Sequence, residues 1–383
     1  MQPPYHFDQI IDRSHTNSFK WDNVSYAGKD MLPMPVADMD FPVAHEIKAC
    51  LDAISEHQIL GYSIVPDSLK IIAQDKIKKS YAWETELDWQ VWIPGIVPGI
   101  TAACAQFASF ETGILTAIPV YHPFHLVANW VKKPLLTFPM VEEGGRWTFD
   151  FVAFEQALQK GPKVFLFCNP HNPGGTVFNE EEIQRIVGLC QQYNCMIISD
   201  EIHADLPIHP QSKHICIGKY IENIPSISFF ASSKTYNTAG LGGAVAIIPD
   251  PELRKQFISA TFGFFPMLSR HSIEVMETSW TMPNTWLNSL LPYLRDNHDV
   301  LFSFIHQQTG LKMLNLEATY LAWIEFDSEK YGDFQQRLFQ NGLHVLRGDQ
   351  FLGGNFIRLN FACPRALLEK AMGIIQLTID ENS

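Results

Sequence analysis

The stretch that decides the fold is VFLFCNPHNPGGTVFNEEEIQRIVGLCQQYNCMIISDEIH, residues 164–203. Residues 164–168 and 196–199 are continuous apolar runs of strand length, which is typical of strands buried on both faces of a parallel sheet. Between them, Asn179 and Glu182 predict a capping box, and apolar residues then recur at helical spacing. A strand, a helix and a second strand in this order indicate an α/β fold.

The length of the chain predicts more than one domain. Its 383 residues exceed what one ordinary hydrophobic core holds, so we expect a large domain and a smaller one. After Pro283 the pattern changes to one long helix or two abutting ones, stopped by Gly310, and then to an α+β pattern. We expect three units: an N-terminal arm that is part of the small domain at 1–45, a large domain with a mostly parallel sheet at 46–284, and a small C-terminal α+β domain at 285–383.

The composition argues against several classes of partner. Acidic residues outnumber basic ones by 41 to 28 and no basic block stands out, so we expect neither nucleic acid nor membrane partners. The start of the chain lacks the pattern of a signal peptide, and no apolar run is long enough to span a bilayer, so we predict a cytoplasmic protein. Seven scattered cysteines without a C-x-x-C pair give no sign of a zinc or redox site.

Two candidate functional residues follow buried strands. Lys234 comes just after the apolar run 227–230, and Asp200 directly follows the apolar run 196–199. Open α/β sheets bind ligands at the carboxyl ends of their strands, where a lysine can form an imine and the hydroxyls of Ser232 and Ser233 suit a phosphate. An aspartate there can hold a protonated ring nitrogen. Taken singly, the lysine is more typical of a polar surface, and the aspartate is also typical of an N-cap or a magnesium ligand.

Three further motifs point to the same edge of the sheet. Asn172 lies in a loop rich in proline and glycine after a strand, where its amide can donate to a ring oxygen or simply belong to a turn. A helix start at 94–99 offers the free backbone N–H groups of Ile96 and Val97 to a phosphate, although such starts are common. Tyr121 follows the strand-like run 115–118 and can either stack on a flat ring or pack in the core.

Two other motifs are rejected as sites. His122 and His125 have the spacing of a metal pair, but Pro123 opposes a helix there, so we expect other roles for both histidines. The glycine-rich run 240–243 precedes a strand instead of following one, which excludes a dinucleotide-binding turn. We predict no metal site.

The order of the motifs is more informative than any one of them. A phosphate-binding turn, Tyr121, Asn172, Asp200, Lys234 and then Arg358 in a separate domain together predict an enzyme that uses pyridoxal 5'-phosphate (PLP) to act on amino acids. Lys234 would carry the cofactor as a Schiff base. The alternation of residues 357–361 places Arg358 on the opposite face of its strand from the apolar residues.

The chain resembles the fold-type I PLP enzymes of the aspartate aminotransferase superfamily, in particular their cystathionine β-lyase branch, the MalY/PatB family. The resemblance spans nearly the whole chain, and the most diagnostic motif is Ala-Asp-Met-Asp-Phe at 37–41. Other matching segments are Phe7-Asp8, Asp12-Arg13, Lys20-Trp-Asp22, Gly61-Tyr-Ser63, Ser199-Asp-Glu-Ile-His203 and Phe356-Ile-Arg-Leu-Asn-Phe-Ala-Cys-Pro364. Pro35 and Ser232 depart from the pattern, since the family usually has Trp and Pro at these positions.

The resemblance implies roles for single residues. Lys234 would bind PLP covalently, Asp200 would pair with the pyridine nitrogen, Asn172 would contact the ring hydroxyl and Tyr121 would stack on the ring. Arg358, with Ala37 and Asn172, would bind the substrate and hold its carboxylate. His203 stands where related enzymes often have a tyrosine near the ring oxygen. Tyr62 resembles a residue that reaches the phosphate of a neighbouring subunit, which implies a homodimer with shared sites.

The reaction implied by the resemblance is cleavage of a carbon–sulfur bond. A freed Lys234 would remove the Cα proton of cystathionine or a related cysteine S-conjugate, and α,β-elimination would yield thiol, pyruvate and ammonia. An aminotransferase would use the same residues and is the alternative. A non-catalytic regulatory protein on this fold is a third possibility, against which the intact Lys234, Asp200 and Arg358 argue.

Overall fold

A large sheet forms the centre of the molecule, for which a computed structural model describes residues 5–26, 30–222 and 224–381. Among these residues, eight strands pair in the order β2-β9-β8-β7-β6-β3-β4-β5. All neighbours from β8 to β4 are parallel, while β2, β9 and β5 join antiparallel, so the predicted mostly parallel sheet is confirmed. The strands are β2 (Gln90–Ile93), β3 (Ile114–Ile118), β4 (Leu135–Glu143), β5 (Arg146–Phe149), β6 (Val164–Cys168), β7 (Met196–Asp200), β8 (Ser226–Phe230) and β9 (Ala244–Ile247).

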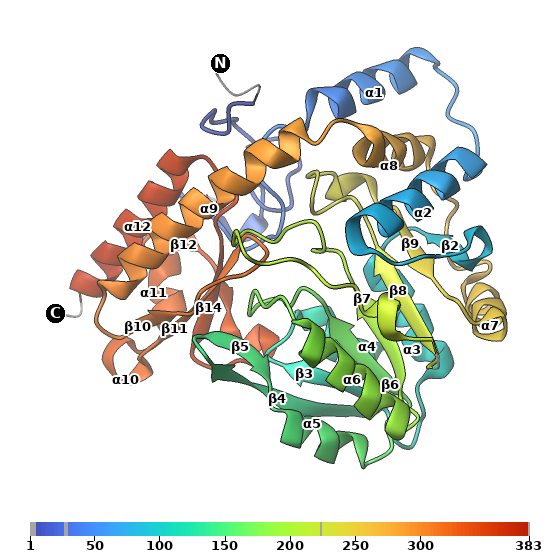
Figure 1. Ribbon diagram of the computed structural model, residues 1–383. Coiled ribbons are helices and arrows are strands. Elements are labelled where there is room, and N and C mark those ends of the chain that lie inside the picture. Colours follow the sequence, from blue (N-terminus) through green and yellow to red (C-terminus); the bar gives the residue numbers. More distant parts are fainter. Residues whose placement is uncertain (1–4, 27–29, 223, 382–383) are drawn as a thin grey trace.

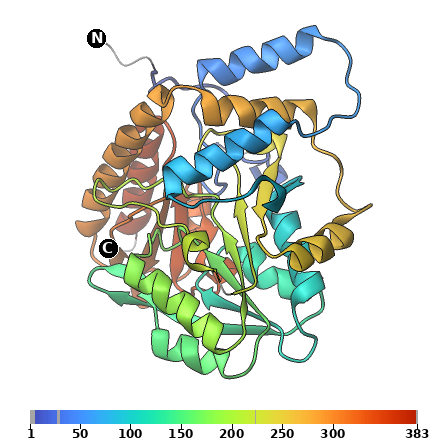
Figure 2. The same ribbon diagram turned by 45° about the vertical axis from the view of Figure 1, so that its right-hand side comes forward.

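Helices cover both faces of this sheet (Figures 1 and 2). Along β6, Phe165 and Phe167 pack into one apolar cluster, whereas Val164 and Leu166 pack into another on the opposite face. The first cluster includes residues of α2 (Asp67–Tyr81), α5 (Phe151–Leu158) and α6 (Glu180–Gln192). The second includes residues of α3 (Ile96–Phe107), α4 (His122–Trp130) and α7 (Pro251–Thr261). Burial on both faces explains why the central strands are continuously apolar.

The helix between β6 and β7 begins where the sequence predicts. The side chain of Asn179 accepts a hydrogen bond of 2.9 Å from the amide of Glu182, and the Glu182 carboxylate accepts one of 2.8 Å from the amide of Asn179. This reciprocal pair satisfies two amides that a helix start leaves without partners. The β-α-β unit of residues 164–203 is therefore confirmed.

A smaller antiparallel sheet lies beside the large one. In the described residues its strands pair in the order β10-β11-β14-β13. The single helix α9 covers it together with α12, and α9 continues through Pro292 without interruption (Figure 1). The elements of this region are α9 (Thr285–His306), β10 (Leu311–Met313), β11 (Leu321–Phe326), α10 (Ser328–Tyr331), α11 (Phe334–Gln340), β13 (Leu346–Arg347), β14 (Phe356–Asn360) and α12 (Arg365–Asp380).

The N-terminal arm joins the smaller sheet region. Strand β1 (Leu32–Pro33) pairs in parallel with β12 (Leu343–His344), and Phe7 and Phe41 belong to the same core cluster as α9 and α12. The arm then leads into α1 (His45–Glu56), which packs against α8 (Arg270–Thr281). The exact domain boundaries stay a prediction. Within the described residues, no helix is both long enough and apolar enough to cross a membrane.

Candidate active site

The candidate residues meet at the carboxyl ends of the central strands. Tyr121 follows β3 and donates its backbone N–H to the carbonyl of Asn172, which follows β6, at 2.8 Å. Arg358 reaches the same place from β14 of the small sheet, and its Nη1 donates to Asn172 Oδ1 at 3.0 Å. Lys234, after β8, donates from Nζ to the carbonyl of Ala37 at 2.5 Å. Residues far apart in the sequence therefore surround one site.

Asp200 offers an acidic group that forms no ion pair with any residue the structure describes. It is 4% exposed, and its Oδ1 accepts a hydrogen bond of 3.0 Å from the amide of Ile202. None of the ion pairs found among the described residues includes it. Burial raises the pKa of this carboxyl to about 7. Such a group is suited to bind the protonated nitrogen of a heterocycle, which would keep the carboxylate charged.

The amine of Lys234 is held in a site that favours its neutral form. Burial, together with the positive charge of Arg358, lowers its pKa to about 8. The carbonyl of Ala37, which accepts its hydrogen bond, also accepts one of 3.1 Å from the hydroxyl of buried Tyr320. A buried lysine with a depressed pKa can act as a nucleophile or a base near neutral pH.

Arg358 is the cation of the site. It is 2% exposed, its Nη2 donates to the carbonyl of Pro35 at 3.0 Å, and its guanidinium lies 4.7 Å from the ring centroid of Phe351. Burial lowers its pKa to about 10, so it stays charged at neutral pH. Its Nε is buried without a hydrogen-bond partner. A substrate carboxylate is the ligand that such a guanidinium binds best.

His203 and the start of helix α3 were also predicted to contact the cofactor. His203 is buried with an unpartnered Nδ1, and burial lowers its pKa to about 3, so the imidazole is neutral. Helix α3 begins at Ile96, and its own hydrogen bonds start with the amide of Gly99, which leaves the amides of Ile96 and Val97 free of intrahelical acceptors. The amide of Gly243 donates to the Pro94 carbonyl at 2.8 Å, which ties this helix start to the segment after Lys234.

The remaining predicted residues divide into buried and exposed ones. Ser232 and Ser233 are buried beside Lys234, at 2% and 9% exposure. Tyr62, by contrast, is 97% exposed and does not line the cavities around the lysine of its own chain. Its predicted contribution therefore requires a second subunit.

The region around His122 corrects one expectation from the sequence. Pro123 does not prevent a helix, because α4 begins at His122 and the proline occupies its first turn, where its missing N–H removes no hydrogen bond. His125 donates a hydrogen bond from Nε2 to the Gln350 carbonyl at 2.8 Å. No group of three potential metal ligands occurs among the residues that the structure describes.

Two cavities open from Lys234. One has a volume of about 490 Å³ and is lined by Lys234, Tyr121 and Arg358, together with Pro35 and Leu346 beside the arginine. The other, of about 630 Å³, extends towards the arm at residues 11–18 and the segment 237–240. Both are lined by Phe19, Val36, Ala37 and Lys234. The exposed ring of Phe19 therefore lies at the common mouth, a position that its sequence context does not indicate.

An ion-pair network fixes the arm that carries Phe19. Lys20, 1% exposed, binds Asp40 at 2.6 Å, and Arg13 binds both Asp38, at 2.7 Å, and Asp40, at 2.6 Å. The indole of Trp21 donates to Asp40 at 2.9 Å. These residues belong to motifs that indicate the family, but the sequence did not reveal that they bind one another.

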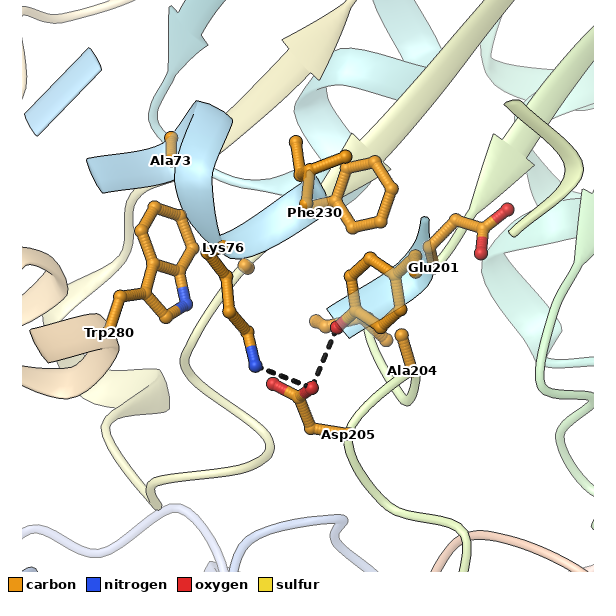
Figure 3. Close-up of a pocket in the computed structure, with 11 residues that line it drawn as sticks. Ala73, Lys76, Glu201, Ala204, Asp205, Phe230 and Trp280 are labelled. Atoms are coloured by element: carbon orange, nitrogen blue, oxygen red, sulfur yellow. Dashed lines mark hydrogen bonds and ion pairs between the residues drawn. The ribbon is translucent and has the colours of Figure 1, made fainter. Parts of the chain in front are cut away.

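A third cavity, drawn in Figure 3, is too small for a ligand. Its volume is about 10 Å³, roughly the minimum for a single water molecule. Asp205 binds Lys76 at 2.7 Å and accepts a hydrogen bond of 2.7 Å from Tyr81, and Figure 3 shows Glu201 directed away from this pair. These contacts tie α2 to the segment after β7.

The chain belongs to the aminotransferase class I and II family, whose model matches residues 34–375. It is 30% identical to cystathionine beta-lyase PatB of Bacillus subtilis (strain 168), over 97% of this chain and 99% of that protein. The crystal structure of OvoB superposes with a TM-score of 0.95 at 33% identity, covering 99% of this chain and 100% of that one. The PLP-bound C-S lyase of Staphylococcus hominis superposes with a TM-score of 0.92 at 27% identity, over 98% of both chains.

Proposed function

We propose that the protein is a PLP-dependent C–S β-lyase that cleaves cystathionine or a related cysteine S-conjugate to thiol, pyruvate and ammonia. The observation that carries the proposal is the convergence of Lys234, Asp200, Asn172 and Arg358 on one buried site. Support for the reaction comes from the relatives, among them a cystathionine beta-lyase and a PLP-bound C-S lyase.

The residues present fit PLP. Lys234 would hold the cofactor covalently, and Asp200, buried without a cation of its own, would bind the pyridine nitrogen. The unpartnered Nδ1 of His203 and the amide of Asn172 would face the polar edge of the ring, and Tyr121 would cover its face. The free amides of Ile96 and Val97, with the hydroxyls of Ser232 and Ser233, would bind the phosphate.

The protein residues divide the chemical work among them. Arg358 binds the substrate carboxylate and so orients the Cα–H bond. Lys234 Nζ, whose low pKa makes the neutral amine available, accepts the Cα proton. PLP, when bound, supplies a conjugated ring that accepts the electron pair left on Cα. Asp200 would keep the ring nitrogen protonated. The thiolate leaves from Cβ and takes up the proton that Lys234 holds, and water hydrolyses the remaining aminoacrylate to pyruvate and ammonia.

Aminotransfer is the second candidate, because the family model that matches the chain is that of class I and II aminotransferases. It would need the same proton acceptor, with the proton returned to the cofactor carbon by Lys234. The two reactions differ in their products. Purified PLP-loaded protein should be mixed with L-cystathionine, and pyruvate and free thiol should be followed together.

Equal release of pyruvate and thiol would support the lyase. Amination of an added keto acid, with neither product formed, would replace the lyase by an aminotransferase. A protein that takes up no PLP and has no visible absorbance would instead favour a regulatory role on this fold.

We further propose that the enzyme is a cytoplasmic homodimer in which Tyr62 serves the phosphate of the neighbouring site. The fully exposed ring of Tyr62 and the exposed neighbours Ile59, Leu60 and Ile64 support an interface, and the free cysteines suit a reducing compartment. Mixed dimers of Tyr62→Phe and Lys234→Ala subunits should regain about half of the wild-type activity, because one of the two sites is intact. No gain over the parent variants would contradict shared sites.

A further inference from the structure

We propose that Tyr320 is a positioning residue for proton transfer at Lys234, and that it acts through the backbone carbonyl of Ala37. The lysine amine and the tyrosine hydroxyl both donate to this one oxygen, at 2.5 Å and 3.1 Å. The proposal rests on the proposed function in that it takes Lys234 as the proton acceptor. It adds a residue that lies outside the sequence motifs of the site.

The shared oxygen restricts where the lysine amine can lie. A carbonyl oxygen has two lone pairs, and the hydroxyl of Tyr320 occupies one of them, so Lys234 Nζ is confined to the other. The contact describes the amine when it is not bonded to PLP, which is the state in which it accepts a proton. A neutral amine that donates one N–H to Ala37 has its own lone pair directed away from the carbonyl. Ala37 therefore orients the lone pair that takes up the proton.

Tyr320 is held so that its hydroxyl cannot follow the lysine. The amide of Thr319 donates to the carbonyl of Leu206 at 2.9 Å, and the amide of Phe361 donates to the carbonyl of Tyr320 at 3.0 Å. The tyrosine is 0% exposed, and burial raises its pKa, so the hydroxyl stays protonated and remains a donor. Because Tyr320 is fully buried within one chain, this contact does not depend on what a second subunit adds to the site.

The carbonyl of Ala37 is fixed as firmly as the tyrosine. Asn360 donates from Nδ2 to the carbonyls of residues 36 and 38, at 2.6 Å each. Asn237 donates from Nδ2 to the carbonyls of residues 39 and 41, at 3.0 Å and 2.9 Å. The segment cannot turn the Ala37 carbonyl away from Lys234 without breaking several of these hydrogen bonds. Such support from surrounding residues is what a reacting group needs to keep its geometry.

The hydroxyl of Tyr320 should disfavour the charged form of the lysine. A second donor on the same oxygen weakens the hydrogen bond that the ammonium makes, and it places the positive end of the O–H dipole beside Nζ. Removing the hydroxyl should therefore raise the pKa of Lys234. The substitution Tyr320→Phe leaves the other groups that act on the lysine in place, namely Arg358, Asp38, Asp200 and the neutral imidazole of His203.

The first experiment measures the reactivity of Lys234 in the full-length apo-protein. Trace acetic anhydride labels the protein across a range of pH that spans the pKa of Lys234, and mass spectrometry quantifies the peptide that contains this lysine. Tyr320→Phe should raise the pKa of Lys234 by about half a unit, so its labelling at neutral pH should fall about threefold.

Tyr331→Phe is the matched control. Tyr331 is 2% exposed, and its hydroxyl also donates to a backbone carbonyl, that of Thr309. Both variants lose one buried hydroxyl of the same kind, but only Tyr320 shares its acceptor with Lys234. The control should label Lys234 at the wild-type rate. Unchanged or faster labelling in Tyr320→Phe, or an equal change in both variants, would overturn the proposal.

The second experiment measures turnover of L-cystathionine by the PLP-loaded enzyme. Tyr320→Phe should lower kcat about tenfold and change KM less than about twofold, because the proposed carboxylate contacts of Arg358 and Asn172 are retained. A rise in KM with unchanged kcat would contradict a role in proton transfer. If the wild type releases no thiol while the difference in labelling remains, the proposed lyase function is refuted and the role of Tyr320 stands.

A second variant serves if Tyr320→Phe does not fold. Placing 3-fluorotyrosine at position 320 retains both the ring and the hydroxyl, and the fluorine makes the hydroxyl a stronger donor to Ala37. The pKa of Lys234 should then fall, and its labelling in apo-protein at neutral pH should be faster than in the wild type. Equal or slower labelling would overturn the proposal.

Discussion

Replacing Arg358 by glutamine should separate substrate binding from cofactor binding. The guanidinium is fully buried and donates hydrogen bonds of 3.0 Å to Asn172 and to the carbonyl of Pro35. Because its Nε has no hydrogen-bond partner, the guanidinium can still donate to a carboxylate. Removing one partner of a desolvated charge pair costs about 2 to 5 kcal/mol. At 1.4 kcal/mol for each factor of ten, kcat/KM for a cysteine S-conjugate should fall about 30- to 4000-fold.

The assay should follow pyruvate release together with the PLP content of the purified protein, which should not change because Arg358 is not among the proposed cofactor-binding residues. Arg347→Gln is the matched control, since Arg347 lies on the neighbouring strand β13, is 43% exposed on its side chain and binds Asp333 at 2.9 Å. Arg358→Lys keeps the charge without the fork geometry and should lose an intermediate amount of activity. A loss below about threefold in a PLP-loaded Arg358→Gln enzyme would refute the proposed role.

Three further predictions test other parts of the site. The rate at which apo-protein binds PLP covalently should rise about tenfold per pH unit up to about pH 8 and then level off, because only the neutral amine of Lys234 reacts. A rate that does not change with pH would contradict the lowered pKa of Lys234. Asp200→Asn should retain PLP, by absorbance, yet lose at least about a hundredfold in pyruvate release; activity close to wild type would count against pairing with the ring nitrogen. Lys20→Met should lower the free energy of unfolding of apo-protein, measured in urea, by about 3 kcal/mol, because it breaks a buried ion pair. The control Lys48→Met removes an exposed ion pair with Asp52 and should lower it by less than about 0.5 kcal/mol. Equal effects of the two substitutions would show that burial of Lys20 is unimportant.

The sequence predicted the large sheet and the positions of its site residues for a physical reason. Strands buried on both faces must be continuously apolar, so β6 and β7 were recognisable, and the polar residues that follow them had to lie at one edge of the sheet. Asn172, Asp200 and Lys234 were therefore accessible to local reasoning. Their individual roles stay predictions until the variants are measured.

Long-range contacts could not be predicted in the same way. Lys20 and Asp40 each look like ordinary surface charges, and nothing local indicates that they form a buried pair. The hydrogen bond from Lys234 to the carbonyl of Ala37 uses the backbone, which carries no side-chain signal. The error at Pro123 was of another kind, because a proline rule for helix interiors was applied to a first turn.

The parallel pairing of β1 with β12 has a consequence for the order in which the protein assembles. The arm that carries Phe19 and Ala37 is fixed beside residues 343–344, which are synthesised near the end of the chain. Contacts this distant in sequence close late, because a long loop of chain must be ordered before they form. We expect the emerging chain to complete the cofactor pocket around Lys234 first. The part of the cavity wall that the arm supplies would be finished only when the last quarter of the protein has left the ribosome.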